Sequence, residues 1–204
     1  MPDQPDGDLL LEVVRRQRAC RSFTHDPVSD ELVEEILTAA SHAPSAENRQ
    51  PWVFVVVRRD DLRRQIGAIY ESAWDAGARA HSESRLDPGL LADVDQGARG
   101  GVAAAPVVIV VCGDASRGHR QALASSIFPA VQNLLLAASA RGLGSALTTL
   151  PVVDGAQVSQ LVGLPEHVIP FAAVPIGWPS RTLGPPRREP VAGKTYRDVY
   201  GNPW

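Results

Sequence analysis

The chain has 204 residues, of which 44% are apolar and 21% are charged, and its formal net charge is −3. This length and composition fit a single domain over residues 1–204 with a sizeable core. The charge balance argues against a nucleic-acid-binding protein, which needs a basic excess on one face. The chain does not begin with a basic segment followed by an apolar run, and no apolar stretch approaches the roughly 20 residues of a membrane span. We therefore expect a soluble, cytoplasmic protein.

Apolar residues at helical spacing predict two helices before Pro44. The first of them ends near residues 16–18. The second follows Ser29, whose hydroxyl suits the N-cap position, and ends at the proline. Its predicted buried face is formed by Leu32, Val33, Ile36, Leu37 and Ala40. The aromatic and β-branched run over 52–57 then predicts a buried strand.

The middle of the chain continues this alternation of helices and strands. An amphipathic pattern over 61–74 predicts a helix. Residues 76–101 are polar and weakly patterned, so we expect a mobile helix or loop there. A second buried strand over 106–112 leads into a helix over 121–141 that is apolar on most sides and is therefore predicted to be central.

Two more strands are predicted at 145–149 and 168–176, with a short helix between them that Asp154 would cap and that ends at Leu164. The helices are too many and too long to cover one face of a small sheet. The interleaved pattern therefore predicts an α+β fold, a sandwich of three layers.

The C-terminal arm, residues 178–204, differs from the rest of the chain. It contains five prolines and places Tyr196, Tyr200 and Trp204 between charged residues. Such a segment is too irregular to fold alone, and its aromatic rings favour burial against another surface. We interpret it as an extended arm that wraps a second subunit. The alternative is an arm packed on its own domain.

Two glycine-containing segments resemble nucleotide-binding motifs and fail on inspection. Gly193-Lys194-Thr195 ends like a phosphate-binding P-loop, but the leading glycine position is Arg188 and no strand precedes it. Gly142-Leu143-Gly144 begins like a dinucleotide fingerprint, but its third glycine position is Leu147, and here a helix leads into a strand. The sequence therefore predicts neither a P-loop nor a Rossmann site.

Metal and hydrolase chemistry also lack a visible motif. The five histidines form no HxH or HExxH pattern, and no GxSxG elbow is present. Cys20 and Cys112 stand far apart, so we expect two packing thiols in a reducing compartment and no metal site.

Two neighbouring segments do point to a ligand. Arg18 and Arg21 directly follow the first predicted helix, where two guanidinium groups can bind an anion. The loop over 43–51 holds two prolines together with serine, asparagine and glutamine side chains. This combination offers fixed hydrogen-bonding groups for a planar polar ligand.

These segments, in this order, resemble the N-terminal signature of the nitroreductase family. The family pattern R-x-x-R-x-F is present over 18–23, and A-P-S-x-x-N-x-Q-P-W-x-F is present over 43–54. Further matches are Ala105-Pro106, Gln132-Asn133-Leu134, Gly142-Leu143-Gly144-Ser145, Val174 to Pro179 and Arg188-Glu189-Pro190. The matches cover roughly half of the chain, and none falls within 58–101.

The resemblance implies a three-layer α/β/α sandwich with a mixed, mostly antiparallel sheet. It also implies a homodimer with two FMN sites at the subunit interface, each built from both chains. The FMN phosphate and ribityl chain are expected near Gln17, Arg18, Ala19, Arg21 and the arm residue Arg188, for which Arg187 is a possible substitute. The flavin ring is expected between Pro44, Ser45, Ala46 and Asn48 of one subunit and Leu147, Thr148 and Thr149 of the other, with a backbone N–H directed at flavin N5.

Two positions depart from the family pattern. Many members read Arg-Arg-Ser at the positions of Gln17, Arg18 and Ala19. Glutamine supplies no charge and alanine no hydroxyl, so the departure implies either a weaker contact to the phosphate or compensation by Arg15, Arg16 or Arg187.

The resemblance implies an FMN-dependent NAD(P)H oxidoreductase. In the family's ping-pong reaction, NADH or NADPH transfers a hydride to flavin N5 and then an acceptor takes its place, so the flavin is the reactive centre and no side chain acts as acid or base. Arg21 would stabilise the reduced flavin near N1 and O2. The expected acceptors are nitroaromatics, quinones or enones. Our hypothesis for a substrate lid names Tyr70, Trp74, Arg79, His81 and Arg85.

Two alternatives remain open at this point. The chain could resemble relatives that fragment reduced flavin, the dimethylbenzimidazole synthases, or that remove halogen from an aromatic ring. It could also be a non-catalytic flavin-binding protein, a reading that only Gln17 and Ala19 favour.

Overall fold

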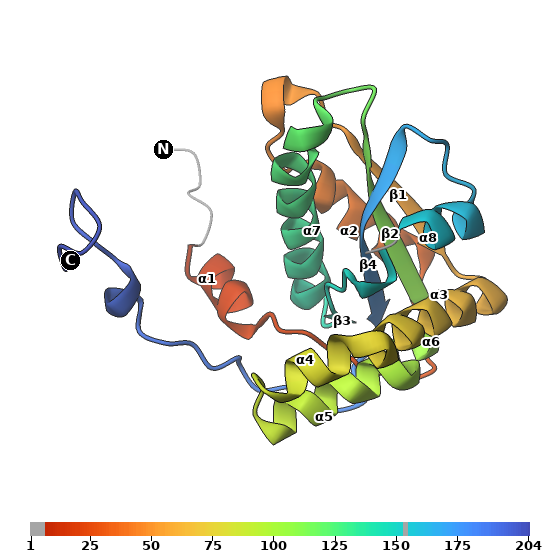
Figure 1. Cartoon of the computed structure of the whole chain (residues 1–204), viewed down its shortest axis with the longest axis horizontal. Coiled ribbons are helices and arrows are strands. Elements are labelled where there is room, and N and C mark those ends of the chain that lie inside the picture. Colours follow the sequence, from red (N-terminus) through yellow and green to blue (C-terminus); the bar gives the residue numbers. More distant parts are fainter. Residues whose placement is uncertain (1–6, 153–154) are drawn as a thin grey trace.

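The computed structural model describes residues 7–152 and 155–204. Four antiparallel strands form one sheet in the order β1-β2-β4-β3, and helices lie on both of its faces (Figure 1). The strands are β1 (Trp52–Val57), β2 (Val107–Asp114), β3 (Gly144–Ser145) and β4 (Val168–Gly177). A parallel pairing occurs at the isolated bridge between Ala19 and Ser145. These features confirm the predicted α+β fold with a mixed, mostly antiparallel sheet.

The two faces of the sheet carry separate cores. In the central strand β2, Ile109 and Val111 pack with helices on one face, whereas Val108 and Val110 pack with helices on the other. The first layer consists of α2 (Asp30–Ser41) and α7 (Leu123–Ala140). The second consists of α3 (Asp60–Ala73), α6 (Val102–Ala104) and α8 (Gly155–Val162). Because alternate strand residues point to opposite faces, a fully apolar strand requires this three-layer arrangement.

Several predicted elements are confirmed closely. The β1 strand has the predicted bounds, and α1 (Gly7–Arg16) ends where the first helix was expected to end. At α2, the hydroxyl of Ser29 accepts a hydrogen bond from Leu32 N–H at 3.3 Å. A serine N-cap satisfies one of the free N–H groups at a helix start, so the boundary follows from local chemistry.

The prediction for residues 145–149 was wrong in extent. The β3 strand ends at Ser145, and Thr148 pairs again with Ala173 as an isolated bridge. The neighbouring strand carries Pro175 at this level, and proline has no N–H to donate to a ladder. The predicted cap Asp154 lies outside the described residues.

The weakly patterned residues 76–101 are mainly helical. They contain α4 (Arg79–Glu83) and α5 (Pro88–Gln96), and each of them adjoins a π-helical turn, over Trp74–Ala78 and Gly97–Gly101. Together with α3 and α6 these helices form an antiparallel hairpin along one side of the molecule (Figure 1). At α5 the carboxylate of Asp87 accepts a hydrogen bond from Leu90 N–H, and Pro88 follows it, which is a typical helix start.

One helix contradicts the expectation about apolar stretches. The helical residues Arg120–Ala140 are long and apolar enough to cross a bilayer by length and composition. In the fold, however, Ile127, Val131 and Leu134 of α7 pack against α2 and the sheet. The central helix of a protein core has the same composition, so its position in the core accounts for its apolar character.

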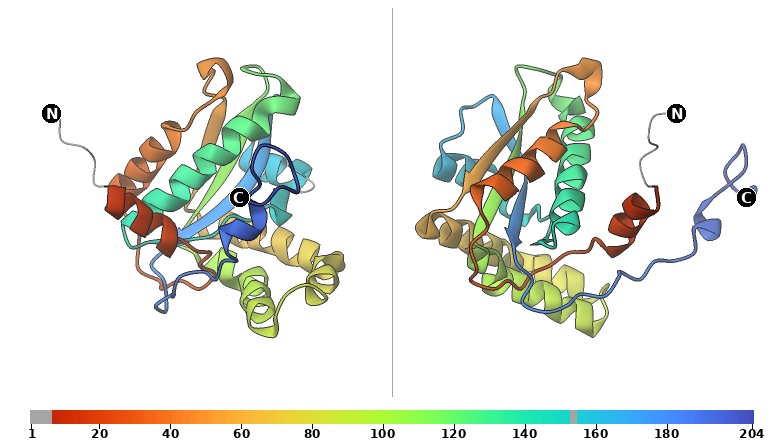
Figure 2. Two further views of the ribbon diagram at one scale, coloured as in Figure 1. Left: turned by 90° about the vertical axis from the view of Figure 1, so that its left-hand side faces the viewer. Right: turned by 180° about the vertical axis from the view of Figure 1, so that it is seen from behind.

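Both ends of the described chain project from the body. Helix α1 buries no residue and exposes Leu9, Leu10, Leu11 and Val14. The C-terminal arm extends away from the body and ends in a small loop (Figure 2). Within that loop, the guanidinium carbon of Arg197 lies 5.5 Å from the centroid of the Trp204 ring. In this chain the distal arm does not cover its own domain.

We predict that neither thiol reacts in the folded protein. Cys112 is fully buried and Cys20 is 3% exposed. Burial raises the pKa of Cys112 to about 12 and also raises that of Cys20. The reactive thiolate is therefore scarce at pH 8. Titration with DTNB should detect no thiol in the native protein and both after unfolding in guanidinium; fast labelling of a native thiol would contradict this packing.

Candidate functional site

The arginine segment over 17–23 is held against the short strand β3. Ala19 forms a parallel bridge with Ser145, and Cys20 N–H donates to Ser145 O at 2.9 Å. The approach is close, since a Cβ atom on Gly144 would lie 2.6 Å from the sulfur of Cys20. Glycine at position 144 therefore allows the segment to extend the sheet, which fixes the direction of the side chains on either side of Cys20.

Arg18 is half-buried beside a pocket at this edge of the sheet. One of its nitrogens, Nη1, donates to the carbonyl of Gly184 at 3.0 Å. A guanidinium has five N–H donors, so others stay available for an anion. The pocket is lined by Arg16, Gln17, Arg18, Ser139, Gly142 to Ser145, Pro179 and Leu183.

Arg21 lies further along and faces a second pocket. Its Nη1 donates to Asp93 Oδ2 at 2.9 Å, which ties it to helix α5. Its side chain lines the pocket together with Tyr70, Leu147 and Thr148. The pockets of Arg18 and Arg21 are lined by neighbouring residues of the chain, Ser145 in the first and Ala146 in the second, but the first borders α7 and the second borders α3.

The segment 147–149 presents both an apolar side chain and backbone groups. Leu147 is 42% exposed, although its neighbours on the N-terminal side are buried. The N–H of Thr148 donates to Ala173 O at 3.0 Å. A backbone donor from this segment to a ligand therefore has to come from a residue other than Thr148.

The loop over 44–50 is the most strained part of the described backbone. Glu47, Asn48 and Gln50 have φ values of 53°, 53° and 49°. Non-glycine residues in this left-handed region cost energy, and such residues concentrate at functional sites. Ser45 supports the loop, because its hydroxyl accepts a hydrogen bond from Gln50 N–H at 3.0 Å. Pro44, Ala46 and Asn48 are exposed on its surface.

Ser126 is a supporting residue that sequence reasoning missed. It lies in α7, is 2% exposed and accepts a hydrogen bond from Ala46 N–H at 3.2 Å. The available signal was the position of this serine on the face of α7 whose other buried residues are apolar. Its hydroxyl connects the strained loop to the core helix.

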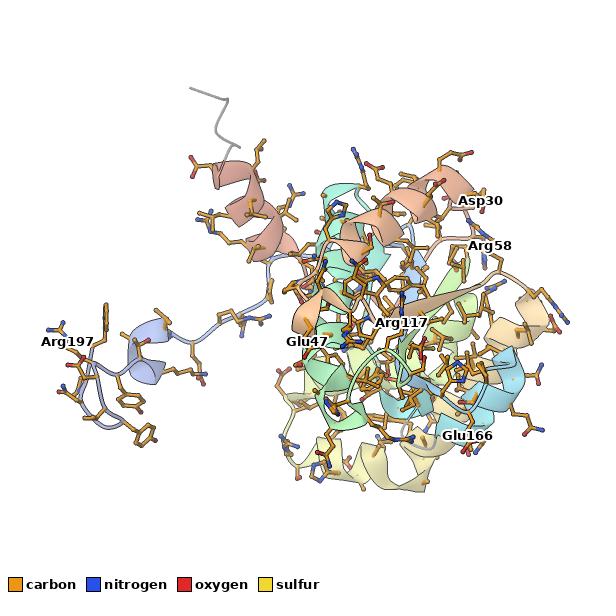
Figure 3. All side chains as sticks on the ribbon, turned by 90° about the horizontal axis from the view of Figure 1, so that it is seen from above. Asp30, Glu47, Arg58, Arg117, Glu166 and Arg197 are labelled. Carbon is orange, nitrogen blue, oxygen red and sulfur yellow. The ribbon has the colours of Figure 1, made fainter. Side chains whose placement is uncertain are left out.

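The predicted site residues form two groups at opposite ends of the sheet. One group is the arginine segment with residues 147–149, and the other is the loop over 44–50. Trp52 follows the loop and pairs with Gly113, at the far end of β2. Ser145 pairs with Ile176, which pairs with Val107 at the near end. The eight residues of β2 span about 23 Å between these ends. Figure 3 looks onto the loop end, where Glu47 and Arg117 lie near each other and Arg197 of the arm lies far to one side. A single chain does not bring the two groups together.

The arm arginines follow shortly after Gly184, whose carbonyl Arg18 contacts. Arg187 and Arg188 are exposed beyond Gly184, and Arg188 Nη1 donates to the carbonyl of Arg187. No hydrogen bond or ion pair among residues 7–152 and 155–204 connects either side chain to Arg18.

The residues predicted for a lid occupy different environments. Trp74 is 2% exposed and donates from its indole nitrogen to Asp95 Oδ1 at 3.0 Å, so it packs inside the hairpin. Together with Arg79 and Arg99, this indole lowers the pKa of Asp95, and its hydrogen bond is the largest contribution. Tyr70 lines the pocket of Arg21. Arg79, His81 and Arg85 lie at the tip of the hairpin, where Arg85 Nη1 and His81 Nε2 are 2.8 Å apart.

Within the part of the chain that the structure describes, no metal-binding group of histidine, cysteine and carboxylate residues occurs.

Comparison with known proteins identifies relatives of this chain by sequence and by fold. The sequence model of the nitroreductase family matches residues 14–178. A protein of Methanothermobacter thermautotrophicus, named as a candidate NADH dehydrogenase/NAD(P)H nitroreductase, is 32% identical over 178 residues, or 86% of this chain and 80% of the relative. The 5,6-dimethylbenzimidazole synthase of Rhodospirillum rubrum is 33% identical over 200 residues, or 93% of this chain and 91% of the relative. The structure of iodotyrosine deiodinase bound to FMN and 3-iodo-L-tyrosine superposes with a TM-score of 0.74 at 25% identity, over 93% and 98% of the two chains.

We predict that Ser126→Ala loosens the loop over 44–50. The change removes the acceptor of Ala46 N–H, and a hydrogen bond of this kind contributes about 0.5–1.5 kcal/mol. Trypsin should then cleave faster after Arg49, measured by mass spectrometry of native digests. Ser125→Ala is the matched control, because this neighbouring serine is exposed and donates only to Ala122 O. Equal cleavage rates in the two variants would show that Ser126 does not hold the loop.

Proposed function

Because the chain belongs to the nitroreductase family, we propose that it is an FMN-dependent oxidoreductase. It uses NADH or NADPH to reduce a small electron-poor acceptor such as a nitroaromatic, a quinone or an enone. The observation that carries the proposal is the placement of two guanidinium groups beside the segment 143–148, Arg18 at one pocket and Arg21 at another.

The chemistry of these pockets fits FMN. The first offers a half-buried guanidinium with free donors, as a phosphate requires, and each charge-assisted hydrogen bond contributes about 1.5–3 kcal/mol. The second is a small cavity of about 20 Å³ in one chain, so a flat ring would lie over its mouth, against the exposed side chain of Leu147 and beside the guanidinium of Arg21. Gln17 and Ala19 add no charge at the first pocket, so the affinity for the phosphate group depends mainly on Arg18.

The separation of the two site halves supports a homodimer. About 23 Å of sheet lies between the arginine segment and the loop over 44–50. A flavin that contacts both must therefore take the loop from a second copy of the chain. The exposed apolar side chains of α1 and of the arm, Val199, Tyr200 and Trp204 among them, supply a surface for such a copy. In this proposal the arm wraps the partner and carries Arg187 and Arg188 toward its phosphate site.

Bound FMN would supply the redox chemistry, and the chain would supply orientation and electrostatics. Arg21 places a positive charge beside the ring pocket, where it would stabilise negative charge. Leu147 presents an apolar surface that excludes water from one side of the pocket. The strained loop holds its polar backbone in a fixed position. No side chain of the two pockets needs to act as acid or base.

A second candidate function has its own support. The dimethylbenzimidazole synthase of Rhodospirillum rubrum is 33% identical over 200 residues, and iodotyrosine deiodinase shares the fold. A flavin-fragmenting or a dehalogenating activity is therefore the alternative. Aerobic incubation of the protein with reduced FMN, followed by mass spectrometry for dimethylbenzimidazole, selects the first; release of iodide from 3-iodo-L-tyrosine selects the second.

The buried, reduced thiols agree with a cytoplasmic location, which we also propose.

The first test of the proposal is the absorbance spectrum of the purified protein with added FMN. We expect bound oxidised flavin that bleaches on anaerobic addition of NADH or NADPH. Arg18→Ala should weaken FMN binding roughly 10- to 100-fold, because it removes one or two charge-assisted hydrogen bonds to phosphate. Arg85→Ala, an arginine of the hairpin tip, should leave the dissociation constant unchanged. A protein that neither retains nor binds FMN would refute the oxidoreductase assignment.

Complementation between two impaired variants, at an FMN concentration that saturates the wild-type protein but not Arg18→Ala, tests the two-chain site. One variant is Arg18→Ala, and the other carries Asn48→Trp, which blocks the loop face. Each homodimer has two defective sites, but a mixed dimer has one intact site. After unfolding and joint refolding at equal amounts, random pairing should restore about one quarter of the wild-type sites. Activity no higher than that of the separate variants would show that one chain builds the whole site.

A further inference from the structure

Asp93 connects three segments that lie far apart in the chain. Its Oδ2 accepts the hydrogen bond from Arg21 Nη1 at 2.9 Å, and its Oδ1 accepts one from Arg181 Nη2 at 2.7 Å. Arg21 belongs to the N-terminal arginine segment, Asp93 to helix α5, and Arg181 to the start of the arm. The carboxylate is 13% exposed, the lowest value for an acidic partner among the ion pairs of the described residues. Solvent therefore screens this pair less than the others.

Arg21 is packed tightly against the π-helical turn that follows helix α5. A Cβ atom on Gly97 would lie 2.6 Å from Cδ of Arg21, and one on Gly101 would overlap the arginine's carbonyl oxygen. The two glycines let the helical turn approach the arginine along its length. With the stem of Arg21 packed in this way, the carboxylate of Asp93 decides where its guanidinium points. The same side chain lines the pocket of Leu147 and Thr148.

We propose that Asp93 is a positioning residue that tunes the bound flavin through Arg21, an inference that rests on the proposed function. The carboxylate holds the guanidinium at the ring pocket and offsets part of its positive charge. A positive charge at this place favours reduced FMN, which carries more negative charge than oxidised FMN. Asp93 therefore keeps the reduction potential of bound FMN lower than Arg21 alone would set it. Arg181 shares the carboxylate and opposes this effect.

Asp93→Asn tests the inference, because asparagine keeps the shape and one acceptor oxygen but removes the charge. The ratio of the FMN dissociation constants, oxidised over reduced, should rise about tenfold, which for a two-electron couple raises the potential by about 30 mV. The constants are measured by anaerobic titration of the apoprotein, and the potential by equilibration with a redox dye. Asp75→Asn is the matched control on the same hairpin, since Asp75 pairs with Arg99 and not with Arg21. It should leave both quantities unchanged.

Two further variants test whether Asp93 affects the flavin through Arg21. Arg181→Gln should lower the same ratio roughly threefold, because Asp93 then acts on Arg21 alone. Arg181 is 57% exposed, so this variant tests the inference even if Asp93→Asn does not fold. In an Arg21→Gln background, the effect of Asp93→Asn should shrink to less than half. An unchanged ratio, or a shift that persists in full without Arg21, would overturn the inference. Failure of the wild-type protein to bind FMN would overturn the proposed function together with it.

Discussion

The antiparallel ladder between β2 and β4 is the constraint on which the rest of the molecule depends. Every residue from Val107 to Cys112 is fully buried, so helices must cover both faces of the sheet. The register of this ladder also sets the two ends at which the predicted ligand residues gather. The arginine segment pairs with β3 at one end, and the strained loop leads into β1 at the other. In the proposed function, a flavin that contacts both ends therefore needs a second copy of the chain.

The residues proposed to contact FMN are held by others that do not contact it. Ser126 connects the loop over 44–50 to the core helix α7. Gly97 and Gly101 let helix α5 and its following turn approach Arg21, and Asp93 orients the guanidinium. Such support keeps polar groups in position before a ligand arrives, which lowers the cost of ordering them on binding. The ion pair between Asp93 and Arg21 also connects the helical hairpin to the pocket that Arg21 lines.

Local patterns predicted those parts of the fold that local chemistry decides. The apolar run of β1 and the capping serine Ser29 were read correctly because strand burial and helix capping depend on a few adjacent residues. For residues 76–101 the sequence pattern predicted a mobile helix or loop, although Asp87 and Pro88 carry a helix-start signal. The helical spacing of apolar residues is weak in this segment, because its helices bury only a narrow apolar stripe and expose polar residues elsewhere. The length of β3 depended on Pro175 in another strand and was therefore out of reach.

By itself, the sequence determined the family of the chain and its α+β class, and it indicated the two segments that are proposed to bind the ligand. Adjacent residues carry those motifs, so no contact between distant segments was needed to read them. Only the tertiary structure decided how their side chains are used. It buried Trp74 inside the hairpin, committed the N–H of Thr148 to Ala173 and paired Arg21 with Asp93. Each of these outcomes is a contact between residues at least 20 positions apart, and such contacts follow from packing, which no local pattern records.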